Sequence, residues 1–215
     1  MTSFVYLIEM IGTIAFAISG AIVAVEKCMD IFGVIVLGVT TAVGGGMIRD
    51  VLLGNLPPTM FKNPTYVIVA VITSILVFIL MYYLHEKIDR YSKFMDQCLN
   101  LADSIGLGIF VVAGVNTAAV HGFSDLAFLS IFVGTLTGVG GGVTRDILAG
   151  RVPVIFQKRV YAVAAILGAS AYYYISTLLD TNTAMLIGIS VTLTIRMLAT
   201  YFEWNLPRIH ERKKN

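Results

Sequence analysis

Charged residues are scarce in this sequence: 13% of its 215 residues are Asp, Glu, Lys or Arg, against about 25% in an ordinary soluble domain. The formal net charge of +2 is too small to indicate a nucleic-acid partner. Cysteine is rare too, and Cys28 and Cys98 lack metal-site or disulfide-framework spacing, so we expect free thiols. Hydrophobic residues, by contrast, make up 57%, and the mean hydropathy is +0.85. This composition indicates a membrane protein.

Seven hydrophobic segments are long enough to cross a bilayer as helices, which needs about 20 largely apolar residues. Met-Thr-Ser alone precedes the first segment, so we expect a permanent span rather than a cleaved signal peptide. Helices satisfy their own backbone hydrogen bonds in lipid, so we predict an all-α integral membrane protein with a single membrane domain, 1–215. The predicted spans are 4–25, 31–56, 64–84, 98–120, 125–151, 158–178 and 183–204.

The basic residues are distributed unequally between the two sides that seven spans define. Twelve lie on the side of the C-terminus: Lys27, Lys87, Arg90, Lys93, Arg145, Arg151, Lys158, Arg159, Arg208, Arg212, Lys213 and Lys214. The other side has two, Arg49 and Lys62. Lys and Arg prefer the cytoplasmic side. We therefore predict an outer N-terminus and a cytoplasmic C-terminus, with a basic tail at 205–215 as the orientation anchor.

An internal repeat divides the chain. Residues 38–57 align without gaps to 134–153, and 11 of the 20 pairs are identical. Gly12 with Gly108 and Ala17 with Ala113 extend the match more weakly at the same offset of 96. We predict repeat 1 at about 4–84, repeat 2 at about 98–178 and an extra helix at about 183–204. Because each repeat has three spans, the two are inverted, a design that recurs in proteins that move solutes; duplication kept only as a scaffold is the alternative.

Each repeat carries three consecutive glycines near the middle of its second helix. An interior glycine costs a helix about 1 kcal/mol relative to alanine, so three together favour a kink or an unwound segment. Freed carbonyls can replace part of a cation's hydration shell, and freed amides can hold an anionic group such as a lipid phosphate. Close packing of helices is the alternative. The predicted pore-lining helix breaks are Gly44, Gly45, Gly46, Gly140, Gly141 and Gly142.

An Arg-Asp pair follows each glycine triplet: Arg49 with Asp50, and Arg145 with Asp146. Charges at membrane depth cost about 2.5–3.5 kcal/mol each unless they face a partner or water. Adjacent helical residues point in different directions, so we expect each pair to bond with the opposite repeat rather than internally. Interfacial charges that reach the headgroups are the alternative.

Other polar groups fall within the spans and are candidates to line a hydrated pathway. Each hydroxyl could instead bond to its own helix backbone. Glu9 and Asp103 lie early in the first helix of each repeat and could be mouth charges or simply interfacial. Arg196 lies within the last span and could pair with an acidic group or reach the interface. The predicted pore-lining polar residues are Ser19, Thr41, Asn116, Thr137 and Asp103.

With seven spans, an inverted 3+3+1 plan and two GGGxxRD motifs, the chain resembles the prokaryotic members of the TRIC family, the trimeric intracellular cation channels, also catalogued as glycine transporters. The resemblance covers about residues 4–204. It implies a homotrimer with one pore in each protomer, helices kinked at both triplets, permeant K⁺ (and Na⁺) and phospholipid bound between protomers. No cofactor or metal is expected. The animal Lys-Glu-Val signature is replaced by "MIRD" after the first triplet, and 98–120 holds no lysine, so animal-type gating is not implied.

Three classes of function remain. A potassium-permeable channel in a prokaryotic inner (plasma) membrane leads, because no dense acidic cluster would trap a cation and passive conduction needs weak sites. A secondary transporter of a small zwitterion such as glycine is the alternative, since broken helices can bind a carboxylate and an amine. An enzyme is not expected, because His85, His121 and His210 lie in loops or the tail and each candidate aspartate has an arginine neighbour.

Overall fold

The computed structural model describes residues 3–83, 88–157, 160–202 and 204, with side chains omitted for 88–93 and 157. The predicted tail, 205–215, and Lys158 and Arg159 lie outside the described residues. In the described part, all regular structure is helical: α1 Ser3–Glu26, α2 Ile31–Leu52, α3 Thr59–Lys62, α4 Thr65–Tyr83, α5 Ile88–Ala118, the π-helix η2 Ala119–Phe123, α6 Ala127–Leu148, α7 Val154–Gln157, α8 Val160–Ile175 and α9 Thr181–Tyr201.

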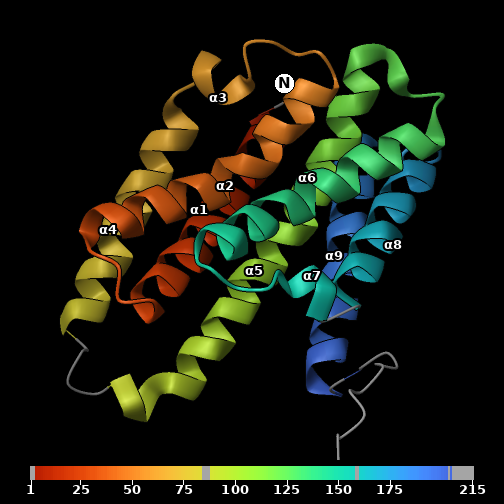
Figure 1. The fold of residues 1–215 in the computed structure, drawn as a ribbon. Helices are drawn as coiled ribbons and strands as arrows, with labels where there is room; N and C mark the ends of the chain where they lie inside the picture. Colours follow the sequence, from red (N-terminus) through yellow and green to blue (C-terminus); the bar gives the residue numbers. More distant parts are fainter. Residues whose placement is uncertain (1–2, 84–87, 158–159, 203, 205–215) are drawn as a thin grey trace, which may run out of the picture.

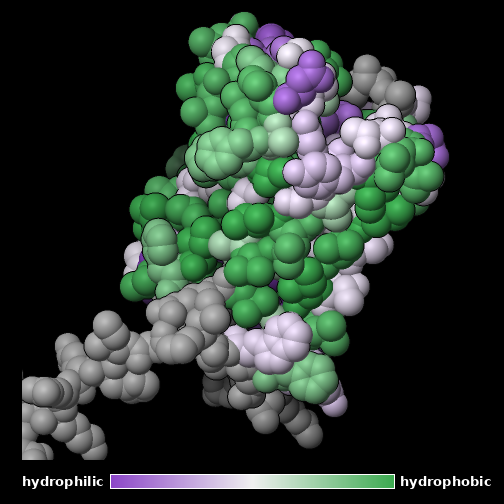
Figure 2. All heavy atoms as spheres, turned by 90° about the vertical axis from the view of Figure 1, so that its right-hand side faces the viewer, coloured by the Kyte–Doolittle hydropathy of each residue, from purple (hydrophilic) through white to green (hydrophobic). Residues whose placement is uncertain are grey.

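Six of these helices are long and apolar enough to cross a membrane, and α8 is a shorter apolar helix. At 16 residues, α8 is about 24 Å long, which is shorter than a hydrocarbon core of about 30 Å. Helix α1 begins at the upper end of Figure 1 and α9 ends at the lower end. The face drawn in Figure 2 is mainly hydrophobic, with hydrophilic residues gathered toward its upper end. The chain is thus an all-α integral membrane protein.

The fold is an inverted repeat of three main helices plus one. Repeat 1 consists of α1, α2 and α4, and repeat 2 of α5, α6 and α8, while α9 packs against α5 and α8. A short helix, α3 or α7, follows the second helix of each repeat; α3 lies at the upper end of Figure 1 and α7 in its lower half. Helices α2 and α6 pack against each other at the centre.

Local sequence signals place the helix ends. Asp30 caps α2 by accepting a hydrogen bond of 2.8 Å from the backbone N–H of Gly33. Gly54 and Gly150 follow α2 and α6 with φ of 70° and 65°, the left-handed conformation that glycine adopts at low cost after a helix. These turns end the helices at Leu52 and Leu148, a few residues before the predicted ends.

Neither glycine triplet unwinds its helix, while a kink at the triplets stays a prediction. Helix α2 continues through Gly44–Gly46 and α6 continues through Gly140–Gly142, so the prediction of unwound helices at the triplets is wrong. The alternative, close packing, has a direct geometric basis. A Cβ on Gly45 would overlap the carbonyl oxygen of Thr137, and a Cβ on Gly141 would overlap that of Thr41. The glycines let two helix backbones touch at the crossing, and the packing contacts offset their low helix propensity.

The first helices of the two repeats correspond at a different sequence offset from the predicted 96. A Cβ on Gly20 would lie 2.8 Å from the Cα of Gly38, and a Cβ on Gly114 would lie 2.8 Å from the Cα of Gly134. Gly20 therefore corresponds to Gly114, an offset of 94, whereas α2 and α6 keep 96. The predicted pairs Gly12 with Gly108 and Ala17 with Ala113 are wrong.

The change in register comes from a longer connection in repeat 2. Two additional residues separate α5 from α6 relative to the connection between α1 and α2, in the region of η2, where Gly122 has φ of 88°. In the corrected register, Glu9 matches Asp103 and Phe16 matches Phe110. The last two rings stack at 5.3 Å between centroids, at the centre of the pseudo-twofold arrangement.

Candidate functional site

A cavity of about 470 Å³ lies toward the end of the molecule where α1 begins. Its walls come from α1, α2, α3, α4 and α5, and exposed residues of η2 and the first residue of α9 complete the lining. Mid-helix, it reaches Phe110, whose ring stacks on Phe16. The polar lining residues are Glu9, Thr13, Arg49, Asp50, Asn55, Thr59, Tyr66, Asn116, Thr117, His121 and Thr181.

Three buried charged side chains share this cavity. Arg49 Nε donates to Asp50 Oδ1 at 2.8 Å, and one of its terminal nitrogens lies 3.9 Å from Glu9 Oε1. Tyr66 Oη donates to Glu9 Oε2 at 2.6 Å. With both carboxylates ionised, two negative charges and one positive charge leave the cluster with a net charge of −1. A cavity with this sign favours a cation.

Asp50 also fixes the chain that follows α2. Its second carboxylate oxygen, Oδ2, accepts a hydrogen bond of 2.6 Å from the backbone N–H of Thr59, the first residue of α3. A carboxylate that accepts from both a guanidinium and a helix N-terminus is strongly held, because both bonds are charge-assisted. The Arg-Asp pair therefore joins the end of α2 to α3 at the wall of the cavity.

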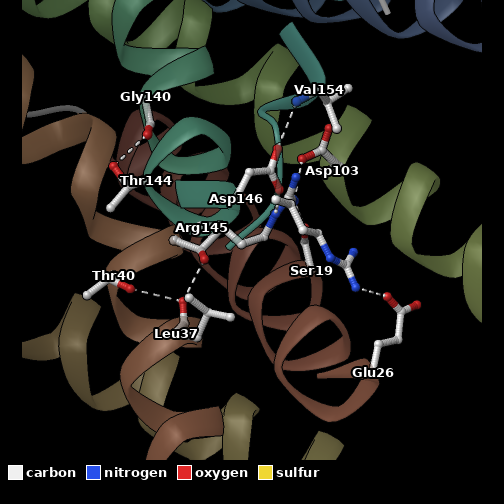
Figure 3. A network of polar contacts seen from close by, with 12 residues as sticks. Ser19, Glu26, Leu37, Thr40, Asp103, Gly140, Thr144, Arg145, Asp146 and Val154 are labelled. Carbon is white, nitrogen blue, oxygen red and sulfur yellow. Dashed lines mark hydrogen bonds and ion pairs between the residues drawn. The ribbon is translucent and has the colours of Figure 1, made fainter. Parts of the chain in front are cut away.

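The second repeat contains a matching cluster with a different surrounding (Figure 3). Arg145 Nε donates to Asp146 Oδ1 at 2.9 Å, and Arg145 Nη1 donates to Asp103 Oδ1 at 2.7 Å. Asp146 Oδ2 accepts from the backbone N–H of Val154, the first residue of α7, at 2.9 Å. Arg145 Nη1 also donates to Ser19 Oγ of the first repeat. All of the acidic and basic side chains here are buried.

The extra helix adds a second arginine to this cluster. One terminal nitrogen of Arg196 lies 3.6 Å from Asp103 Oδ2, and its guanidinium carbon lies 4.5 Å from the ring centroid of Tyr161. This distance is within the range of a cation–π interaction. Two positive and two negative charges make the second cluster formally neutral, whereas the first cluster carries −1.

The predicted site residues divide among three places. Asn116 lines the cavity and accepts a hydrogen bond of 3.0 Å from Tyr172 Oη. Ser19 and Asp103 belong to the second cluster. Thr41 and Thr137 lie at the crossing of α2 and α6, and each hydroxyl donates to its own helix at 2.6 Å. Their hydroxyls are outside the lining of the cavity, as the backbone-bonding alternative predicts.

The prediction that the Arg-Asp pairs avoid internal bonds is wrong in both repeats. The guanidinium is long enough for its Nε to fold back onto the neighbouring carboxylate, which adjacent Cβ directions alone do not reveal. Among the residues that the structure describes, these pairs bond to the opposite repeat in one place, where Arg145 donates to Ser19. Both arginines otherwise bond within their own repeat.

Sequence reasoning missed the matched roles of Glu9 and Asp103 and the two tyrosines beside them, Tyr66 and Tyr161. The ungapped offset of 96 placed the acidic residues two positions apart. An alignment that allowed a two-residue gap between the first and second helices would have paired Glu9 with Asp103 and Phe16 with Phe110.

The fold and these sites define a membrane protein of inverted three-helix repeats, with one buried Arg-Asp cluster in each repeat. The chain belongs to the TRIC family: the family model described as "Glycine transporter" matches residues 6–82 and 100–177. It is 42% identical to the inner membrane protein YadS of Escherichia coli K12 over 207 residues, or 94% of this chain and 95% of YadS. It is 36% identical to the membrane protein YvgT of Bacillus subtilis over 201 residues, or 94% of each chain.

Solved channel structures have the same fold. A chain from a study described as "Structural basis for conductance through TRIC cation channels" gives a TM-score of 0.80 at 38% identity, covering 96% of this chain and 97% of that one. The trimeric intracellular cation channel orthologue from Rhodobacter sphaeroides gives 0.84 at 31% identity, covering 94% and 100%. These structural neighbours are channels rather than enzymes.

Proposed function

We propose that this protein is a potassium-permeable cation channel, with one pore in each protomer of a homotrimer. The observation that carries the proposal is the cavity of about 470 Å³, whose wall holds two carboxyl groups, Glu9 and Asp50, and one guanidinium, Arg49. Its carboxylates attract a cation, while Arg49, 3.9 Å from Glu9, limits how tightly the cation binds. Weak binding is what passive conduction requires. The structural neighbours, which are cation channels, support this class of function.

In this proposal, the ion pathway follows the pseudo-twofold arrangement. A cation enters the cavity of the first repeat, passes the stacked rings of Phe16 and Phe110 and leaves along the second cluster. The glycine crossing holds α2 and α6 together beside this path, with Gly45, Gly140 and Gly141 at the close backbone contact. The charge network consists of Arg49, Asp50, Arg145 and Asp146.

The orientation and surroundings are part of the same proposal. The unequal distribution of basic residues supports an outer N-terminus and a cytoplasmic C-terminus in a prokaryotic inner membrane. The cavity then faces the outside, because its lining includes Val5 and Glu9 at the start of α1. Phospholipids and two further copies of the chain are the proposed partners, and no enzymatic activity is proposed.

Transport of a small zwitterion is the second candidate. The description of the family model as a glycine transporter supports it, and so does the presence of opposite charges, Glu9 and Arg49, in one cavity. A bound zwitterion would place its amine on the carboxylate and its carboxylate on the guanidinium.

Flux measurements on purified protein in vesicles separate the two candidates. A channel gives unitary currents and a potassium flux that follows the electrochemical gradient without a coupled ion. A transporter gives glycine uptake that saturates and depends on an ion gradient. Arg49→Lys is the informative variant, because it keeps the charge but loses the planar fork that holds a carboxylate; it impairs the transporter more than the channel.

A further inference from the structure

One pseudosymmetric half of the molecule contains an open cavity, and the equivalent region of the other half is closed. Asn116 and Thr117 line the open cavity, whereas their counterparts in the first helix, Ile22 and Val23, are buried at 2% and 0% exposure. A channel that conducts through both halves must open the second half, so the question is what holds that half closed.

In the described part of the closed half, two polar contacts cross between the repeats. Arg151, just beyond α6, forms an ion pair with Glu26 at the end of α1, with 2.7 Å between Nη2 and Oε2. Both side chains are partly exposed, at 30% and 24%. Deeper in the same half, Arg145 donates to Ser19 Oγ. Figure 3 labels Ser19 and Glu26 of α1 together with Arg145 and Asp103 of the second repeat.

The open half has the same backbone positions but cannot form either contact. The counterparts of Glu26 and Arg151 are Val120 and Asn55, which lie at the cavity instead of forming an ion pair.

The counterpart of Ser19 is Ala113, which has no hydroxyl to accept from Arg49. The difference between an open and a closed half therefore coincides with residues that the repeat did not conserve.

We propose that Glu26–Arg151, together with Ser19–Arg145, is a latch that closes the ion pathway at the end of the molecule opposite the N-terminus. Arg151 and Glu26 hold the C-terminal end of α1 against the loop after α6, and Arg145 holds α1 at Ser19. The Glu26–Arg151 pair is partly exposed, so raising the ionic strength weakens it. This inference rests on the proposed channel function, and it names the element that regulates the pathway.

The test measures accessibility and therefore does not depend on current. Val23→Cys is introduced into a Cys28→Ser, Cys98→Ser background, and its rate of modification by a membrane-impermeant maleimide is measured on protein in nanodiscs, where both faces are exposed to reagent. Thr117→Cys is the matched control, because it occupies the equivalent position in the open half and lines the cavity. It is modified rapidly whatever the state of the latch.

Loss of one latch residue exposes the thiol introduced by Val23→Cys. Glu26→Gln and Arg151→Gln each increase the modification rate of this thiol about two- to fivefold, the range expected for a partly exposed ion pair. Adding Ser19→Ala increases the rate further, to about tenfold or more. The charge swap Glu26→Arg with Arg151→Glu restores the slow rate, which a merely destabilised protein would not do.

The outcomes separate the latch from the channel. An unchanged rate for the Val23→Cys thiol in all of these variants, with the Thr117→Cys thiol modified normally, would overturn the latch even if the protein conducts potassium. Faster modification with rescue by the charge swap supports the latch, and single-channel recording of Glu26→Gln then tests conduction separately. A higher open probability than in the unsubstituted protein is expected; absence of any current would count against the channel proposal alone.

Discussion

The role of the glycine triplets is tested by two substitutions one residue apart, Gly44→Ala and Gly45→Ala. A Cβ on Gly45 would overlap the carbonyl oxygen of Thr137 and lie 3.3 Å from the amide nitrogen of Gly141. Both neighbours are backbone atoms of a packed helix and cannot rotate away. A Cβ on Gly44 would meet the Thr144 hydroxyl at 3.5 Å, an ordinary contact.

The two substitutions should therefore change the free energy of unfolding in opposite directions. Both gain about 1 kcal/mol of helix propensity. Overpacking a core costs about 1–3 kcal/mol, and contact with fixed backbone places Gly45→Ala at the upper end. We expect Gly45→Ala to lower the free energy of unfolding by about 2 kcal/mol, whereas Gly44→Ala raises it by up to about 1 kcal/mol.

The assay is reversible unfolding of the protein in mixed micelles by sodium dodecyl sulfate, followed by circular dichroism. Gly141→Ala should behave as Gly45→Ala does, because its Cβ would overlap the carbonyl of Thr41. Equal changes in the free energy of unfolding for Gly44→Ala and Gly45→Ala would contradict the packing role, because the triplet would then act as a unit, as a broken helix predicts.

Three further predictions concern the charged groups. Glu9→Gln removes a carboxylate from the cavity and should lower unitary potassium conductance more in 0.1 M salt than in 1 M salt, because the screening length shortens from about 10 to about 3 Å over this range. The control is Asp30→Asn, which changes an exposed helix cap at the opposite end of the molecule. An equal loss of conductance in both variants would contradict this role of Glu9. Asp50→Asn removes the carboxylate that pairs with Arg49 and should lower the free energy of unfolding by about 3 kcal/mol, whereas Asp125→Asn, on the surface, should change it by less than about 0.5 kcal/mol. The hydrogen bond from the backbone N–H of Thr183 lowers the pKa of Asp180 at the start of α9. The contribution of Asp180 to stability is therefore present above its unfolded pKa and lost as the pH falls through its folded pKa. Asp180→Asn should remove this loss of stability at low pH, measured by unfolding at a series of pH values, while it keeps the helix cap.

The sequence predicted the inverted 3+3+1 fold well, because hydrophobic length and the GGGxxRD repeat are both one-dimensional signals. It located Arg49, Asp50, Arg145 and Asp146, but not their bonds, because those depend on side-chain conformation and on a register that only packing reveals. A glycine triplet breaks a helix or lets two helices touch, and the partner across the crossing decides which. The sequence does not specify that partner.

The difference between the halves was also beyond sequence reasoning. Arg196 was recognised as unusual within the last span, but its contact with Asp103 and Tyr161 requires the position of α9 against the second repeat. Likewise, Glu26 and Arg151 appear in the sequence as ordinary charges at helix ends, 125 residues apart. Only their closeness in the structure gives them a role.

The most direct test of the account is single-channel recording of the purified protein in planar bilayers under asymmetric potassium chloride, comparing the unsubstituted chain with Glu9→Gln. We expect discrete openings that reverse near the potassium equilibrium potential, with smaller steps at low salt in Glu9→Gln. Openings that reverse near the chloride potential would contradict it. So would a bilayer without steps, if the same preparation accumulates glycine in vesicles by saturable uptake driven by an ion gradient.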